Sequence, residues 1–204
     1  MPDLSIENEQ RAIGFGTVAG VDEAGHGPLA GPVSAAAAVL PADFDHPYLN
    51  DSKKLSELRR ESLYEEIVSG ALGLVAWSSA LATVEEIEEI NILEATHLAM
   101  RRAVDGLPQR PDIVLIDGRP VKDFPHSHIG VIKGDSKSLS IAAASIVAKV
   151  ERDRLMVAYA EEFPQYGFEK HKGYGTKQHL DALAEHGPCP IHRKMFGPVA
   201  RVTG

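Results

Sequence analysis

The chain of 204 residues has a formal net charge of −8, 44% hydrophobic residues, 25% charged residues and a single cysteine. Its length suits one well-buried core, and its composition is that of an ordinary globular protein. The sequence has no apolar run of the roughly 20 residues that a membrane helix needs, and one cysteine excludes an internal disulfide, so we expect a cytoplasmic protein without a membrane partner.

The N-terminal part of the chain predicts a short leader followed by buried strands. Residues 1–14 are polar and acidic, which favours a frayed leader and excludes a secretory signal. The apolar run at 17–22 predicts a short buried strand that ends in a turn-rich segment at 24–28. Residues 32–40 are ambiguous, because their alanines favour a helix while their length and flanking prolines favour a second strand.

The middle of the chain predicts alternating helices and strands. A helix is predicted at 56–68 with Ser56 as its N-cap, and its apolar positions include Leu58, Leu63 and Ile67. A strand is predicted at 72–79. An amphipathic helix is predicted at 92–104, with Asn91 as its N-cap and one apolar stripe formed by Ile92, Ala95, Ala99 and Ala103.

The C-terminal part predicts two further strands and two helices. The apolar run at 112–116 indicates a buried strand, and 131–133 a short one. The longest helical pattern covers 140–160. A last helix is predicted at 176–185, with Thr176 as its N-cap and Gly187 just after its end.

Alternating strands and helices favour the α/β class. We expect a main domain at 14–160 and a helical extension at 161–204 that packs on it, since the last residues carry no strand signal. Residues 1–117 have a net charge of −12 and residues 118–204 a net charge of +4. This asymmetry indicates either uneven surface charge or a local basic face in the C-terminal half.

Four acidic residues follow predicted strands. Asp22 and Glu23 end the first strand, Asp117 ends the strand at 112–116, and Asp135 follows the run at 131–133. Ligands of open α/β sheets bind beyond the carboxyl ends of the strands, so these carboxylates are expected to meet. Their mutual repulsion favours a bound cation, and Mg²⁺ prefers such oxygen ligands. The alternative is that each acid only caps a turn.

The glycines at 25, 27 and 31 form the pattern G-x-G-x-x-x-G. The dinucleotide fingerprint is G-x-G-x-x-G, and Pro28 lacks an amide proton for a phosphate, so no nucleotide cofactor is expected. Gly25 and Gly27 still permit close approach of the backbone to a ligand, the alternative being a simple turn.

Several segments resemble the motifs of ribonuclease HII, the type 2 ribonuclease H family, in the family's order across roughly residues 14–199. The matching segments are GVDEAGHGPLAGPV at 20–33, DSKKL at 51–55, IDG at 116–118, KGD at 133–135, SIAAASIVAKV at 140–150, RD at 152–153, HKGYGT at 171–176 and HR at 192–193. The resemblance implies a ribonuclease H-like fold, with a mixed five-stranded sheet flanked by helices and a helical C-terminal extension.

The resemblance also implies an endonuclease that cuts the RNA strand of RNA–DNA hybrids. Such enzymes incise 5′ of ribonucleotides embedded in duplex DNA, in replication and repair, and leave 3′-hydroxyl and 5′-phosphate ends. The metal ligands and catalytic residues implied are Asp22, Glu23, Asp117 and Asp135, with Mg²⁺ or Mn²⁺ and two ions during catalysis. The expected partners are hybrid and ribonucleotide-containing duplexes, bound by a monomer.

Further residues are implied to contact the substrate. In the family, the glycine loop and a tyrosine recognise the ribonucleotide, which points to Gly25, His26, Gly27 and Tyr174. Lys53, Lys54 and Lys149 are candidates for phosphate contacts. Taken alone, the lysines would read as solvated surface residues and Tyr174 as a loop anchor. His26 departs from the family's usual arginine, which leaves the contribution of this side chain open.

Three alternatives remain at this level. Another metal nuclease of the same fold fits the acids, although ribonuclease HIII carries a long N-terminal domain for which the roughly 15 residues before the first strand leave no room. A hybrid-binding protein without catalysis is a rival from another class, against which the four acids argue. His171, His179, His186, His192 and Cys189 match no standard zinc spacing, so zinc is not expected.

Overall fold

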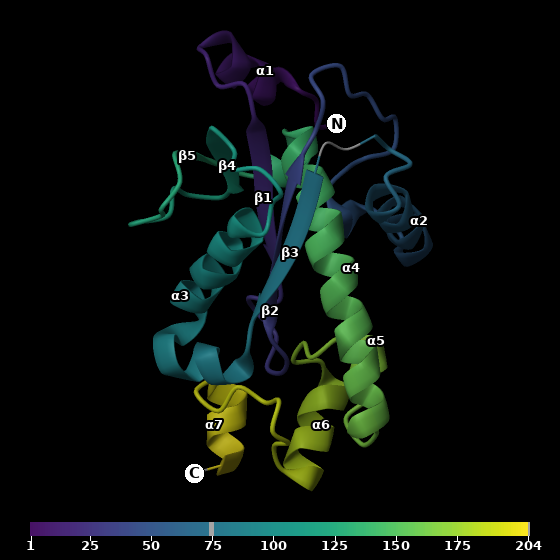
Figure 1. Cartoon of the computed structure of the whole chain (residues 1–204). Helices are drawn as coiled ribbons and strands as arrows, with labels where there is room; N and C mark the ends of the chain where they lie inside the picture. The colour runs from purple at the N-terminus through teal and green to yellow at the C-terminus, as the bar shows by residue number, and fades with distance from the viewer. Residues whose placement is uncertain (74–75, 204) are drawn as a thin grey trace.

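A mixed five-stranded sheet with the order β3-β2-β1-β4-β5 forms the centre of the computed structural model, which describes residues 1–73 and 76–203 (Figure 1). The strands pair antiparallel from β1 to β3 and parallel from β1 through β4 to β5. Their bounds are β1 Val18–Ala24, β2 Val33–Val39, β3 Ala76–Ala82, β4 Ile113–Asp117 and β5 His128–Val131.

Helices cover both faces of this sheet. The helical segments are α1 Ser5–Ala12, η1 Ser52–Lys54, α2 Glu57–Val68, α3 Val84–Asp105, η2 Gly134–Ser136, α4 Leu139–Glu162, α5 Phe168–His171, α6 Lys177–His186 and α7 Gly197–Thr203. One hydrophobic core lies between α3 and the sheet, and a second lies between the sheet, α4 and α2. Figure 1 shows α3 and α4 on opposite sides of the strands, with α5 to α7 at the lower end. The predicted α/β fold is confirmed.

The ambiguous segment at 32–40 is strand β2. All seven of its residues are buried, because α3 lies on one face and α4 on the other. A strand buried on both faces has no polar side to show in its sequence, and its alanines let both helices approach closely. Helix propensity is therefore overridden here by the tertiary environment.

The predicted helices are confirmed with shifted ends. Ser56 caps α2, since its hydroxyl accepts a hydrogen bond from the Arg59 amide, and Leu63 and Ile67 are buried while Leu58 is exposed. Helix α3 begins at Val84, eight residues earlier than predicted. The chain breaks its helical geometry at Asn91, whose side-chain oxygen accepts hydrogen bonds from the amides of Leu93 and Glu94. The predicted cap therefore begins the second half of a longer helix.

Some predicted boundaries are wrong. Strand β3 covers Ala76–Ala82 where 72–79 was predicted, and residues 74–75 of that prediction lie outside the described residues. Strand β5 ends at Val131, where the prediction began. The short helices α5 and α7 carry too few residues for a periodic pattern and were not predicted.

The predicted frayed leader is also wrong, because residues 5–12 form helix α1. Glu7 is completely buried, and its Oε1 accepts hydrogen bonds from the Ser138 hydroxyl at 2.6 Å and from the Ser140 amide and hydroxyl at 2.9 and 2.7 Å. These donors lie at the N-terminus of α4, where an acidic group is favoured. The first helix is thus fastened to the longest one through a single side chain.

Gly20 sets the distance between β1 and α4. A Cβ at this position would lie 2.2 Å from the carbonyl carbon of Ser140 and 2.3 Å from the amide nitrogen of Ile141. Both are backbone atoms, so no side-chain rotation could make room. The absence of a side chain therefore lets the start of α4 lie directly against β1, two residues before Asp22.

Within the described part of the chain, no helix is both long and apolar enough to cross a membrane.

Candidate active site

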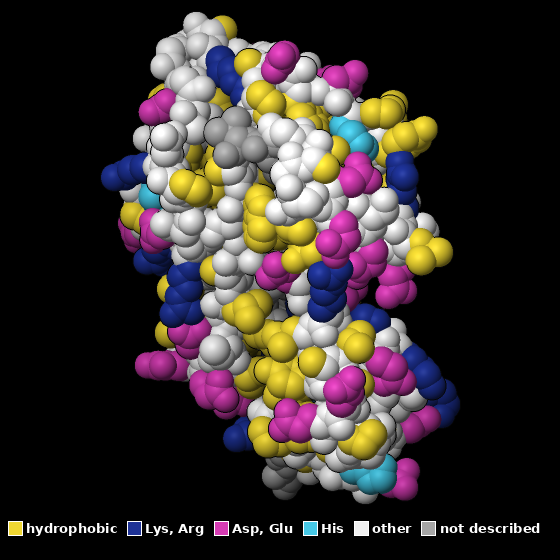
Figure 2. Space-filling view, turned by 45° about the vertical axis from the view of Figure 1, so that its right-hand side comes forward, with side chains coloured by type: hydrophobic (Ala, Val, Ile, Leu, Met, Phe, Trp, Pro, Cys, Tyr) yellow, Lys and Arg dark blue, Asp and Glu magenta, His cyan; other side chains and the backbone are white. Residues whose placement is uncertain are grey.

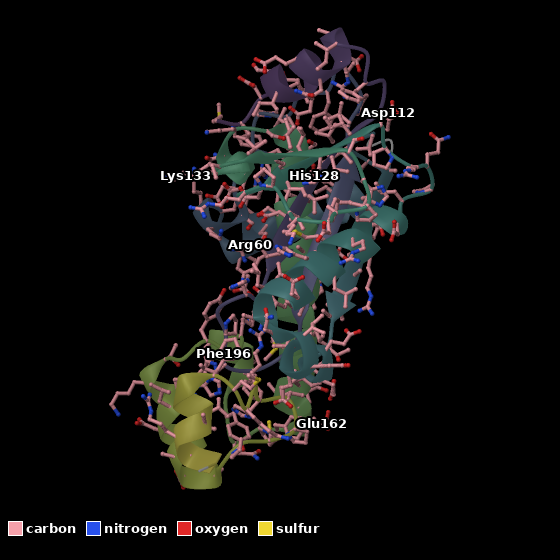
Figure 3. All side chains as sticks on the ribbon, turned by 90° about the vertical axis from the view of Figure 1, so that its left-hand side faces the viewer. Arg60, Asp112, His128, Lys133, Glu162 and Phe196 are labelled. Atoms are coloured by element: carbon pink, nitrogen blue, oxygen red, sulfur yellow. The ribbon has the colours of Figure 1, made fainter. Side chains whose placement is uncertain are left out.

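Three acidic side chains meet at one edge of the sheet. Because β1, β4 and β5 are parallel, their carboxyl ends lie together. Asp22 lies near the end of β1, Asp117 ends β4, and Asp135 lies in η2 after β5. One carboxylate oxygen of each lies within 4.8 Å of the others. Figure 3 labels Lys133, which begins the turn into η2, and His128, which begins β5.

Asp22 is the most buried of these acids, with 2% of its surface exposed. Its Oδ1 accepts a hydrogen bond of 2.7 Å from the Glu23 amide, while its Oδ2 is buried and has no hydrogen-bond donor among the described residues. Burial first, then the charges of Glu23 and Asp117, raises the pKa of Asp22 well above its usual value. A buried oxygen without a donor beside other carboxylates fits a hard divalent cation, which would compensate both the desolvation and the repulsion.

Asp117 and Asp135 are held by the turn between β5 and α4. Asp117 Oδ1 accepts a hydrogen bond of 2.6 Å from the Gly134 amide, and Lys133 adopts a left-handed conformation that starts this turn. Burial, followed by the charges of Asp117 and Asp51, raises the pKa of Asp135. The Lys53 ammonium lies 3.8 Å from Asp135 Oδ2, and its charge partly offsets the rise in the pKa of Asp135.

Glu23 does not belong to the group of three. Side chains alternate along β1, so Asp22 faces α4 while Glu23 lies on the α3 side, where Ala19 and Val21 pack into the core with α3. Glu23 lines a cavity of about 520 Å³ with Asp117, His26, His97 and Arg119. Burial first, then the charge of Asp117, raises its pKa. Its carboxyl group nevertheless interacts with Asp22 and Asp117, so Glu23 lies beside the group of three without being part of it.

Six of the seven residues expected to contact the substrate line a single cavity of about 260 Å³. Its lining residues are Glu23, Ala24, Gly25, His26, Gly27, Ser52, Lys53, Lys149 and Tyr174. They come from the loop after β1, from η1, from α4 and from the segment before α6. The structure thus brings together side chains that lie up to 149 residues apart in the sequence. Lys54 is not among them and pairs instead with Asp51 at 3.7 Å.

Tyr174 and Lys149 lie beside each other in this cavity. Tyr174 is 45% exposed, so it is not a buried anchor of its loop. The Lys149 ammonium lies 5.8 Å from the centre of the Tyr174 ring and donates a 2.7 Å hydrogen bond to Asp153. Burial lowers the pKa of Lys149, which Asp153 partly offsets. Both side chains are therefore placed to meet a ligand from the same side.

His26 is exposed and its ring lies next to helix α3. Its Nδ1 is 3.1 Å from the Thr96 hydroxyl, which itself donates to the Ile92 carbonyl, so Nδ1 carries the proton. Burial first, then the charges of Arg193 and His97, lowers the pKa of His26. At neutral pH the ring is thus neutral, and its free Nε2 is an acceptor rather than a donor.

A chain of buried groups that the sequence did not reveal lies beneath Tyr174. His179 Nδ1 donates to the Tyr174 carbonyl at 3.0 Å, its Nε2 accepts from His192 Nε2 at 3.0 Å, and His192 Nδ1 accepts from the Cys189 amide. The Cys189 amide can only donate, so His192 Nδ1 is an acceptor and the proton of this ring lies on Nε2. His179 Nε2 is then the acceptor, and its proton lies on Nδ1. Burial lowers the pKa of His179 and brings that of His192 to about 4. These neutral rings support the backbone of the Tyr174 loop.

Comparison with known proteins agrees with this arrangement. A family model described as Ribonuclease HII matches residues 19–199. The chain belongs to the ribonuclease HII family. The ribonuclease HII of Endomicrobium trichonymphae is 57% identical over 187 residues, which cover 91% of this chain and 88% of that protein. The enzyme is therefore a type 2 ribonuclease H, a hydrolase of a metal-dependent family, and its three aspartates could hold a metal ion.

Solved structures of this family share the fold. Ribonuclease H2 from Pyrococcus horikoshii OT3 superposes with a TM-score of 0.72 at 26% identity, covering 91% of this chain and 96% of that one. The RNase HII of Archaeoglobus fulgidus, solved in complex with PCNA, also gives a TM-score of 0.72, at 28% identity and with 88% of this chain and 95% of that one covered. The likeness to the two archaeal enzymes extends through the helical C-terminal part.

Proposed function

We propose that this ribonuclease HII cuts the RNA strand of RNA–DNA hybrids and incises duplex DNA on the 5′ side of embedded ribonucleotides, leaving 3′-hydroxyl and 5′-phosphate ends. The observation that carries the proposal is the meeting of three aspartates beside a cavity lined by Gly25, Gly27 and Tyr174. A 2′-hydroxyl is the group that separates RNA from DNA, and backbone amides with an exposed aromatic ring can read it. The enzyme acts as a monomer, without a nucleotide cofactor, in replication and repair.

Asp22, Asp117 and Asp135 hold Mg²⁺ or Mn²⁺ in this proposal, and Glu23 contributes from the α3 side. Such ions, when bound, supply an activated water and stabilise the leaving 3′-oxygen. The buried Asp22 Oδ2, which has no donor in the part of the chain that the structure describes, is the oxygen best placed to contact a cation. The Gly134 amide holds Asp117 in position. Lys53, beside Asp135, is placed to contact a phosphate oxygen near the reacting group.

Basic groups on the C-terminal side of the site favour a polyanionic substrate. A cavity of about 290 Å³ is lined by Glu57, Arg60, Lys149, Asp153, Lys170, His171, Lys172 and Tyr174. Figure 2 shows a notch between the part of the molecule that carries the sheet and the C-terminal helices, with dark blue Lys and Arg side chains beside it. This local basic face accommodates nucleic acid on a chain whose net charge is −8.

The test of the proposed function is incubation with a DNA duplex that contains one ribonucleotide, followed by mapping of the cut. We expect one nick on the 5′ side of the ribonucleotide in the presence of Mg²⁺ or Mn²⁺, and no nick in EDTA. An all-DNA duplex of the same sequence is the matched control. Equal cutting of both duplexes, or activity that survives EDTA, would contradict the proposal.

Replacing Tyr174 is expected to impair recognition more than folding. Because the ring is 45% exposed, Tyr174→Ala should leave the melting temperature nearly unchanged. Loss of stacking and of the hydroxyl should lower kcat/KM at a single ribonucleotide about tenfold or more. Tyr174→Phe separates the two contributions, since it removes the hydroxyl alone. A large fall in melting temperature with unchanged specific activity would instead identify Tyr174 as a loop anchor.

Restoring the family's arginine at position 26 is expected to tighten substrate binding. The pKa of His26 is lowered below its usual 6.5, so the ring carries almost no charge at pH 8, whereas an arginine stays charged. His26→Arg should therefore lower KM for a hybrid substrate at pH 8 and steepen its dependence on salt by about 0.9 per added phosphate contact at most. KM measured from pH 6 to 9 at two salt concentrations checks this. Superimposable profiles would show that only the loop backbone matters.

A further inference from the structure

Arg193 is completely buried beneath the glycine loop, the segment from residue 25 to residue 32. Its Nη2 donates to the carbonyl of Gly25 at 2.6 Å, and its Nη1 to that of His26 at 3.0 Å. Its Nε donates to the Gly31 carbonyl at 2.9 Å, and Nη2 also reaches the Pro32 carbonyl at 3.2 Å. One planar side chain therefore joins the beginning of the loop to its end.

Arg152 of α4 is also completely buried and binds the same loop from the other side. Its Nε and Nη2 each donate at 3.0 Å, to the carbonyls of Pro32 and Ala30. Its Nη1 donates at 3.0 Å to the carbonyl of Lys172, two residues before Tyr174. Arg152 thus connects the glycine loop to the Tyr174 loop, and the Pro32 carbonyl accepts from both arginines.

No carboxylate among residues 1–73 and 76–203 lies within 4.0 Å of either guanidinium. Buried charges are normally paired, and here burial lowers the pKa of both arginines. The backbone carbonyls that the two side chains bind offset part of the cost of burying these cations, and the centre of the Phe196 ring lies 5.1 Å from the guanidinium carbon of Arg193. The planar guanidinium offers five N–H donors, so each side chain can hold several carbonyls at once, and its positive charge also lies beneath a loop that faces phosphates in the proposed function.

The loop is shaped around these side chains. Gly25 has φ +98°, and a Cβ there would lie 2.0 Å from Arg152 Nε. With the carbonyls of Gly25 and His26 turned towards Arg193, the amides of His26 and Gly27 have no partner among the described residues, and both residues are exposed. Carbonyls held inside and amides free at the surface are the arrangement that binds an anion or a hydroxyl oxygen.

We infer that Arg152 and Arg193 are positioning residues for ribonucleotide recognition: they hold the carbonyls of the glycine loop inward, leave its amides free for the substrate, and fix this loop relative to Tyr174. The inference rests on the proposed function of the glycine loop. It assigns the specificity of the loop to two side chains that do not touch the substrate.

The test is the lysine variant of each arginine in an Asp22→Asn background, which binds without cutting. Arg193→Lys and Arg152→Lys keep the charge but lose the planar fork that binds several carbonyls at once. We measure the Kd for a DNA duplex with one ribonucleotide and for the all-DNA duplex. The ratio of these constants does not depend on the folded fraction, so a loss of stability alone leaves it unchanged. We expect each variant to lower the ratio of the Kd for the all-DNA duplex to the Kd for the ribonucleotide duplex about tenfold.

Arg154→Lys is the matched control, because Arg154 lies on the same helix but binds Glu61 and Glu65 at the surface. It should leave the ratio unchanged. If the parent does not discriminate between the two duplexes, the proposed function fails. If the parent discriminates and folded lysine variants discriminate equally, the positioning role alone is overturned. If one variant fails to fold, the other decides, and failure of both to fold would show that the pair serves the fold rather than recognition.

Discussion

Asp22→Asn, Asp117→Asn and Asp135→Asn should each lower kcat about 100-fold or more at saturating Mg²⁺, a loss of roughly 3 kcal/mol of transition-state stabilisation. Each change removes the charge of one member of the group that meets within 4.8 Å and leaves its shape nearly constant. Cleavage of a single-ribonucleotide duplex measures the effect. Asp112→Asn is the matched control, since Asp112 is exposed and binds the Thr17 amide away from the site. Wild-type rates in all three variants would exclude this group as the metal site.

Asp22→Asn should not destabilise the metal-free protein. Burial and neighbouring charges raise the pKa of Asp22 above its unfolded value, so this group favours the folded state at low pH. That contribution is lost as the pH rises through the folded pKa, and the ionised carboxylate then opposes folding. Asp22→Asn removes the ionisable group and therefore the loss of folding stability that its ionisation causes. The melting temperature of the variant in EDTA at pH 8 should therefore equal or exceed that of the wild type, and depend less on pH.

Glu7→Ala should lower the free energy of unfolding by about 3 kcal/mol, because it leaves three buried donors at the start of α4 without their acceptor. For a chain of this size, the loss corresponds to a fall in melting temperature of about 9 °C. Calorimetry at neutral pH measures it. The matched control is Glu9→Ala, which removes an exposed glutamate from the same helix and should change the melting temperature little. Equal melting of the two variants would show that α1 does not stabilise the fold.

Glu7 also shows why the N-terminal helix escaped prediction. The segment around it is polar, and sequence patterns detect a helix by an apolar face. Its one buried group is an acid whose partners, Ser138 and Ser140, lie 131 and 133 residues away. A polar contact between segments so far apart leaves no periodic signal in either of them. The hydrogen-bonded chain from Cys189 to Tyr174 escaped prediction for another reason: its members lie close in the sequence, but their spacing matches no standard metal motif and their contacts form only in the folded chain.

The acids at the strand ends were predictable because topology alone brings them together. Parallel strands end at the same edge of a sheet, and an apolar run that stops at an acid marks that edge. This reasoning placed Asp22, Asp117 and Asp135 correctly relative to one another. It could not separate Glu23 from Asp22, since the side to which each residue points depends on how the pleat meets α3 and α4. The roles of these residues in metal binding remain a prediction for the variants above.

The glycine loop was only partly predictable from its motif. The pattern of glycines at 25, 27 and 31 predicted a close approach of the backbone to a ligand. In the structure Gly25 is also required by a side chain from α4, because Arg152 occupies the place of its missing Cβ. Arg152 and Arg193 were visible in the sequence as parts of matching segments. Their common attachment to one loop depends on the fold, which brings residues 25, 152 and 193 into contact.

The lack of a side chain at Gly20 affects how a mutational screen of this enzyme is interpreted. Any side chain there must push the backbone of α4 away from β1, since the space is closed by main-chain atoms at 2.2 and 2.3 Å. Glu7 holds the same end of α4 from outside, so the displacement would pass along β1 to Asp22. A substitution at this site would be scored as a loss of catalysis, although it alters no reactive group. The inactivating substitutions in such a screen would therefore identify residues that set the distance between β1 and α4, in addition to residues that take part in the reaction.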